Sequence, residues 1–140
     1  MINRDIITQC LIEIDENLKI LDNLKRLSLD EFKSAPEKYK LAERCLQICI
    51  ECIIDIGDYI ISDKNYPMPK NAAETITTLG DMKILPKEFV SKIVGMANFR
   101  NILIHAYLKI DREIIYKNLQ NISDFREFQK YILEFLKNAR

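Results

Sequence analysis

The 140-residue sequence is poor in helix breakers and has no long apolar run. Three glycines and four prolines are too few for a turn-rich sheet protein, and they suit packed helices better. No segment approaches the roughly 20 apolar residues of a membrane-spanning helix, and the N-terminus lacks the apolar core of a signal peptide. We therefore expect a cytoplasmic protein that does not enter a membrane, with one domain over residues 1–140.

The sequence also lacks net charge. Its 21 Lys and Arg residues are balanced by 21 Asp and Glu residues, so no general basic field attracts a polyanion. Any polyanionic partner would therefore have to be attracted by a few local groups.

Three of the four cysteines could be mistaken for a metal site. Cys45, Cys49 and Cys52 are spaced by four and three residues inside an apolar stretch, which places them on one face of a helix. The paired CxxC spacing of zinc sites is absent. We therefore expect no metal and predict that these thiols are reduced residues of the core.

Apolar residues recur every three or four positions through most of the chain, and no alternating strand pattern longer than a few residues appears. This periodicity predicts an all-α fold, an antiparallel bundle of four long helices plus a short one. The expected long helices cover roughly 6–27, 36–62, 86–107 and 112 almost to the C-terminus, with room for a break near Ser123. The short helix is expected over about 71–80.

The expected boundaries rest on capping residues. Residues 28–35 are predicted to be a connector, and Ser34 with Glu37 is predicted to form a capping box for the second long helix. Asn71 with Glu74 is predicted to start the short helix.

The only histidine lies close to an arginine, an amide and a phenol. On a helix, Arg100 and His105 are five residues apart, roughly 140° around the axis and about 7.5 Å along it. Asn101 lies one turn before His105 on nearly the same face. Cleavage of RNA by its own 2′-hydroxyl needs proton transfer near neutral pH and stabilisation of charge on the phosphate, which histidine and arginine supply. A single histidine does half of the acid–base work, so a second copy or water would do the rest.

Two interpretations of these residues remain open from chemistry alone. A lone histidine flanked by Ile104 and Ala106 is often a structural residue satisfied by a hydrogen bond. Similarly, Glu51, Asp55 and Asp58 either border a groove or form an ordinary solvated face.

Arg100, Asn101, His105 and Tyr107 resemble the signature of the HEPN superfamily, which has an arginine, a polar residue, several apolar positions, a histidine and a tyrosine two residues beyond. Residues 43–61 resemble the second helix of HepT-like proteins, and residues 71–85 resemble their middle region. The resemblance covers roughly residues 1–138.

The resemblance implies a homodimeric, metal-independent endoribonuclease toxin with the motif at the dimer interface. Arg100 and His105 would be catalytic, with Asn101 in support, and the chain itself would need no cofactor. The implied partner is an MNT-type nucleotidyltransferase antitoxin that transfers AMP from ATP to Tyr107. An adenylate there would add bulk and negative charge to the cleft that receives RNA phosphate.

Two other functions compete with this one. The chain could be a non-catalytic HEPN binding module that holds a nucleotidyltransferase partner. Alternatively, the roles of the two proteins could be exchanged, with the nucleotidyltransferase as the poison.

Overall fold

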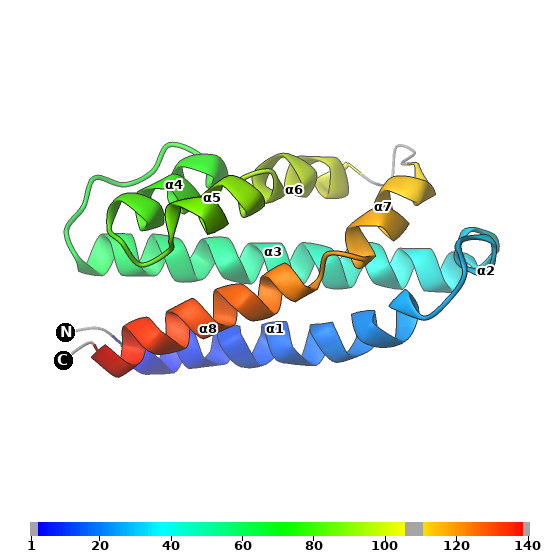
Figure 1. Cartoon of the computed structure of the whole chain (residues 1–140), viewed down its shortest axis with the longest axis horizontal. Coiled ribbons are helices and arrows are strands. Elements are labelled where there is room, and N and C mark those ends of the chain that lie inside the picture. Colours follow the sequence, from blue (N-terminus) through cyan, green and yellow to red (C-terminus); the bar gives the residue numbers. More distant parts are fainter. Residues whose placement is uncertain (1–2, 106–110, 139–140) are drawn as a thin grey trace.

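The computed structural model describes residues 3–105 and 111–138, and within these ranges the chain is helical with no strand. Figure 1 shows long helices lying along the molecule, with a series of shorter helices on one side of the central one. The helices are α1 (Arg4–Lys25), α2 (Leu29–Ser34), α3 (Pro36–Asp63), α4 (Ala72–Asp81), α5 (Lys87–Ile93), α6 (Met96–Ile104), α7 (Arg112–Leu119) and α8 (Ser123–Asn138). No described helix is long and apolar enough to span a membrane.

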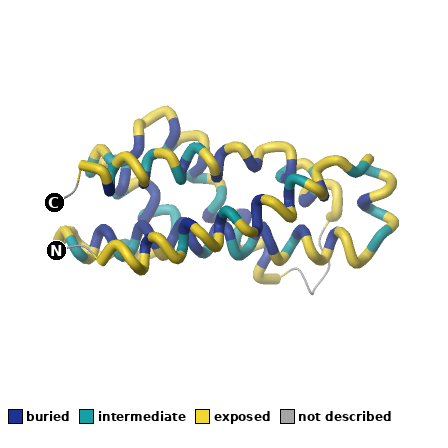
Figure 2. Tube along the Cα trace, turned by 90° about the horizontal axis from the view of Figure 1, so that it is seen from below, coloured by how far each residue is buried: buried dark blue, intermediate teal, exposed yellow. Residues whose placement is uncertain are grey.

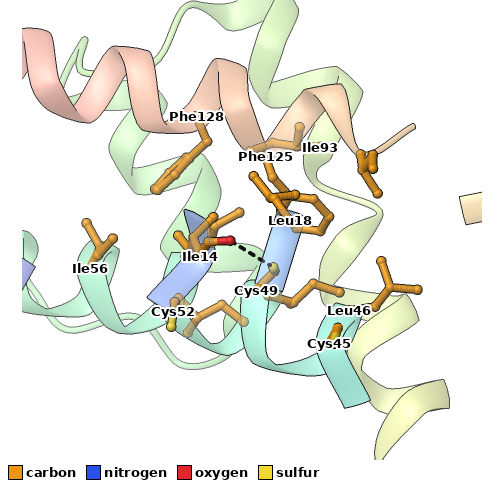
Figure 3. Packing of buried hydrophobic residues seen from close by; sticks show 14 of the residues in the cluster. Ile14, Leu18, Cys45, Leu46, Cys49, Cys52, Ile56, Ile93, Phe125 and Phe128 are labelled. Carbon is orange, nitrogen blue, oxygen red and sulfur yellow. Dashed lines mark hydrogen bonds between the residues drawn. The ribbon is translucent and has the colours of Figure 1, made fainter. Parts of the chain in front are cut away.

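The central helix, α3, buries one broad face against the other helices. Figure 2 shows that buried residues lie on the sides by which the helices face one another. Cys45, Cys49 and Cys52 belong to this core, as predicted, and the Cys49 thiol donates to the Ile14 carbonyl oxygen of α1 at 3.9 Å (Figure 3). Burial raises the pKa of the Cys52 thiol to about 12, so these sulfurs remain protonated near neutral pH.

The predicted connector over residues 28–35 is wrong, because it contains the short helix α2. The capping box is formed by Ser28 and Glu31 rather than by Ser34 and Glu37: the Glu31 amide donates to the Ser28 hydroxyl, and the Ser28 amide donates to the Glu31 carboxylate. The helix α3 begins after Ala35 without a side-chain cap. Phe32 of α2 is fully buried, so burial of this aromatic ring stabilises the extra helical turn. The Asn71 cap of α4 is confirmed.

The last two predicted long helices are each divided in two. The first is interrupted at Val94 and Gly95, where an exposed glycine has poor helix propensity. The second is interrupted between α7 and α8, where the sequence had left room for a break near Ser123, and the buried Ile122 turns inward there. The chain changes direction there, so that α7 packs on α2 while α8 follows α1 (Figure 1). The described residues therefore form eight helices instead of four long ones and a short one.

Candidate active site

The motif lies at the C-terminal end of α6, which packs on α3 and runs in the opposite direction (Figure 1). One face of α6 contributes Phe99 and Leu103 to the core. This burial fixes the rotation of α6 about its axis. Arg100 is thereby left half-buried, and Asn101 and His105 are exposed.

Arg100 is held by an acidic partner on α3. Its Nε donates to Glu51 Oε1, and its Nη2 donates to Glu51 Oε2 at 3.4 Å. The Arg100 and Glu51 side chains are 29% and 34% exposed, so solvent still reaches the pair. The hydrogen bond to Glu51 raises the pKa of Arg100, and the two-pronged contact orients its guanidinium. The sequence had marked Glu51 as a residue near the groove, but it gave no sign of this pairing.

Two further carboxylates follow Glu51 along α3. Partial burial, and then the charges of Glu51 and Asp58, raise the pKa of Asp55. Asp58 accepts a hydrogen bond of 2.7 Å from the hydroxyl of Thr75, a buried residue of α4. Thr75 is a contact that the sequence analysis missed, because no local pattern marks it. Asp55 and Asp58 also lie near Arg100, and their charges contribute, after the hydrogen bond to Glu51, to raising its pKa.

His105 caps the C-terminal end of α6. Its backbone has φ −99° and ψ 18°, and its amide donates to the Ile102 carbonyl oxygen at 3.2 Å. Ile102 and Ile104, on either side of Leu103, are 37% and 40% exposed, so the histidine lies beside apolar surface. Tyr107, the predicted modification site, lies outside the described residues.

The sequence of this chain from residue 14 to residue 132 matches the family model described as ribonuclease HepT-like. The chain belongs to the ribonuclease HepT-like family. The match spans both α3 and α6, which carry the residues described above.

Two curated relatives of this HepT-like chain carry nuclease names. The tRNA nuclease HepT of Aphanizomenon flos-aquae is 34% identical over 96 residues, which is 66% of this chain and 65% of that protein. The mRNA nuclease HepT of Shewanella oneidensis is 26% identical over 84 residues, which is 59% of this chain and 63% of that protein. The chain thus aligns with just under two thirds of each relative.

Solved structures share the fold of this HepT-like chain. A tri-AMPylated HEPN toxin of Shewanella oneidensis, in complex with an MNT antitoxin, superposes with a TM-score of 0.83 at 23% identity, covering 93% of this chain and 98% of that one. The cytosolic protein of unknown function YutE from Bacillus subtilis has a TM-score of 0.85 at 20% identity, covering 97% of this chain and 92% of that one. At these identities the likeness shows the fold alone.

The arrangement combines an oriented cation with an exposed imidazole five residues further along the same helix. A guanidinium fixed at one edge suits a phosphate oxygen, and an imidazole near solvent suits proton transfer. The described residues contain no group of three or more His, Cys, Asp or Glu residues arranged to hold a metal ion.

Proposed function

We propose that this HepT-like chain is an endoribonuclease, the toxin of a type VII-like HEPN/MNT toxin–antitoxin pair, and that it acts in the cytoplasm. The observation that carries the proposal is the orientation of Arg100 by Glu51, beside an exposed His105 at the end of the same helix. Family membership and the nuclease names of both curated relatives support it.

The proposed reaction is attack of the ribose 2′-hydroxyl on the adjacent phosphodiester. His105 accepts the 2′-hydroxyl proton, and Arg100 stabilises the negative charge on the phosphate oxygens. Asn101 supports the substrate through its amide. The 5′-oxygen leaves with a proton from a second acid, which the His105 of a second chain supplies in a homodimer. No metal or other cofactor takes part in this scheme.

Regulation is proposed to act on Tyr107. An MNT-type nucleotidyltransferase antitoxin transfers AMP from ATP to the tyrosine hydroxyl and releases pyrophosphate. The added phosphate is anionic and repels the RNA backbone from the cleft, so the modified toxin is silent. The Shewanella oneidensis HEPN toxin, which is tri-AMPylated and in complex with an MNT antitoxin, supports this step by analogy.

One observation favours the alternative function, a non-catalytic binding module that holds a nucleotidyltransferase. The Arg100 charge is already satisfied by Glu51, so binding a phosphate requires Arg100 to share or leave that partner.

The first test replaces His105. We expect His105→Ala to abolish growth inhibition and RNA cleavage while the circular dichroism spectrum and oligomeric state stay unchanged. Asn98→Ala is the matched control, since Asn98 is an exposed polar residue of α6 outside the motif. If His105→Ala remains fully toxic, the assignment of His105 is wrong.

A second test measures modification. The intact mass of the chain, co-expressed with an MNT-type nucleotidyltransferase, should increase by whole AMP units, and Tyr107→Phe should prevent the increase. Purified unmodified protein should cleave RNA, and modified protein should not. Absence of both added mass and cleavage would favour the binding module.

A further inference from the structure

The outward face of α3 carries a continuous row of polar residues, which we call the α3 stripe. Its members follow one another at intervals of three or four positions, so they lie along one line of the helix. This line is half a turn away from the buried residues Cys49, Ile53 and Ile60. The stripe consists of Lys40, Arg44, Gln47, Glu51, Asp55 and Asp58.

The helices around α3 leave the stripe at least partly accessible. Figure 1 shows α1 on one side of α3, α4 and α6 on the other, and α8 on the side facing the viewer. Lys40, Arg44 and Asp55 are exposed, and Gln47, Glu51 and Asp58 are half-buried. Leu41, next to the stripe, is 41% exposed, so apolar surface accompanies the charges.

Charge is separated by sign along the α3 stripe. Its N-terminal half carries the bases Lys40 and Arg44, and its C-terminal half carries the acids Glu51, Asp55 and Asp58. Among the described residues, no ion pair joins Lys40, Arg44 or Asp55 to another charged side chain. Like charges three or four residues apart on a helix repel each other, so the charges within each half of the stripe repel one another. Glu43 near Lys40 and Arg100 near Asp55 offset part of this repulsion. Partial burial raises the pKa of Asp55 most, and the charges of Glu51 and Asp58 raise it further through that repulsion.

We infer that a second copy of this chain packs antiparallel against the α3 stripe, so that Arg44 of each copy pairs with the partner's Asp55. Resting on the homodimer of the proposed function, this inference specifies which surface forms it and in which register. A face with bases at one end and acids at the other is complementary to itself when turned by a two-fold axis. In this register the bases and the acids of the stripe both meet opposite charges, because Lys40 also lies close to the partner's Asp58.

The same register brings the two motifs together. The two-fold axis crosses α3 level with Cys49 and Ile50, midway between Arg44 and Asp55. Arg100 is level with Glu51, which lies about 2 Å from the two-fold axis along α3. Because α6 runs opposite to α3, His105, about 7.5 Å beyond Arg100 along α6, lies on the other side of that axis. The His105 residues of the two copies are then roughly 10 Å apart along α3, and each His105 is nearly level with the partner's Arg100. A cleft with two imidazoles, as the proposed acid–base chemistry requires, results from the pairing of charges on α3.

The charge pair nearest the two-fold axis should contribute most to the stability of the dimer. Two antiparallel helices cross at an angle, so they diverge with distance from the crossing point. Arg44 and the partner's Asp55 lie about 8 Å from the axis, whereas Lys40 and the partner's Asp58 lie about 13 Å from it. In addition, Asp58 already accepts the Thr75 hydrogen bond.

The experiment is a charge exchange measured by sedimentation velocity on the full chain. Arg44→Glu and Asp55→Arg should each raise the dimer dissociation constant by about tenfold or more, because each places two like charges together twice in the symmetric dimer. Lys87→Glu is the matched control, a charge reversal of an exposed residue on α5, and it should leave dimerisation unchanged.

Mixing the two single variants gives the decisive measurement. In a heterodimer of Arg44→Glu with Asp55→Arg, both cross-chain pairs are again of opposite charge, so the mixture should dimerise as tightly as the wild type. A merely misfolded variant would not recover in this way. Equal dimerisation of all variants, no recovery on mixing, or a monomeric wild type at tens of micromolar would overturn the inference.

The readout separates this inference from the proposed function. RNA cleavage by a dimer that is insensitive to the charge exchange would support the nuclease function and contradict the α3 stripe as the dimer interface. Conversely, recovery of dimerisation on mixing, in a protein that cleaves no RNA, would support the α3 stripe as the dimer interface and contradict the nuclease function.

Discussion

Neutralising Glu51 is the most direct test of how Arg100 is used. The Glu51→Gln change removes a negative charge that contacts the guanidinium but keeps an amide oxygen able to accept from Arg100 Nε. If Arg100 binds the RNA phosphate, the carboxylate of Glu51 competes with the substrate for the same cation. We therefore expect Glu51→Gln to tighten substrate binding.

The magnitude follows from the exposure of the pair. At 29% and 34% exposure, Arg100 and Glu51 form an ion pair close to the surface class, for which the coupling is at most about 1 kcal/mol. Removing a competitor of about 1 kcal/mol lowers KM by about fivefold. Because the amide still orients the guanidinium, kcat should change by less than about threefold. The same substitution should lower the free energy of unfolding by at most about 1 kcal/mol.

The assay is steady-state cleavage of a fluorescent RNA at a protein concentration that keeps the chain fully dimeric. Asp63→Asn, the same charge change near the C-terminal end of α3, is the control and should alter KM by less than about twofold. A fall in kcat of a hundredfold with KM unchanged would refute the competition argument, since Glu51 would then act in the chemical step. An unchanged KM and kcat would show that Arg100 does not bind the substrate.

Two further predictions concern the fold. Ser28→Ala should lower the free energy of unfolding by about 1 kcal/mol in urea titrations, because it removes the capping box of α2. Ser34→Ala, at the cap that the sequence had favoured, should lower it by less than half as much, and equal effects would contradict the structure. Cys52, with its pKa raised by burial to about 12, should react with iodoacetamide at pH 8 about a thousandfold more slowly in the native protein than in urea, and the native rate should increase with pH. Rapid native labelling, read by peptide mass spectrometry, would contradict its burial.

Local sequence patterns were sufficient to predict a helix where that helix is defined by its own apolar face and caps. The predicted α1, α3 and α4 agree with the structure to within a few residues because each buries one continuous stripe. Both Ser28 with Glu31 and Ser34 with Glu37 fit the capping pattern, so local rules did not separate them. Phe32 decided between them, since its ring packs on Tyr116 with a centroid distance of 5.5 Å. That contact joins residues 84 positions apart in sequence, and periodicity carries no information about it.

The candidate site shows the same difference between local and long-range contacts. Arg100 and His105 were predicted from a motif and a chemistry that are local to one helix. The partner of Arg100 was not found, because Glu51 is 49 residues away and joins it only through the packing of α6 on α3. A carboxylate on an amphipathic helix has the same sequence signature whether it meets solvent or a cation.

Net charge illustrates why composition is a weak guide to this surface. Equal numbers of acids and bases exclude a basic field over the whole molecule, yet helical spacing collects the bases and the acids of α3 at opposite ends of one face. An RNA phosphate bound at Arg100 would therefore have three carboxylates of α3 on one side, while the bases of the stripe, Arg44 and Lys40, lie towards the other end of α3. If a second copy covers the α3 stripe, the partner's Arg44 offsets Asp55, and the potential beside Arg100 becomes less negative. Dimerisation would then do more than supply a second histidine, because it would also make the cleft accessible to a phosphate.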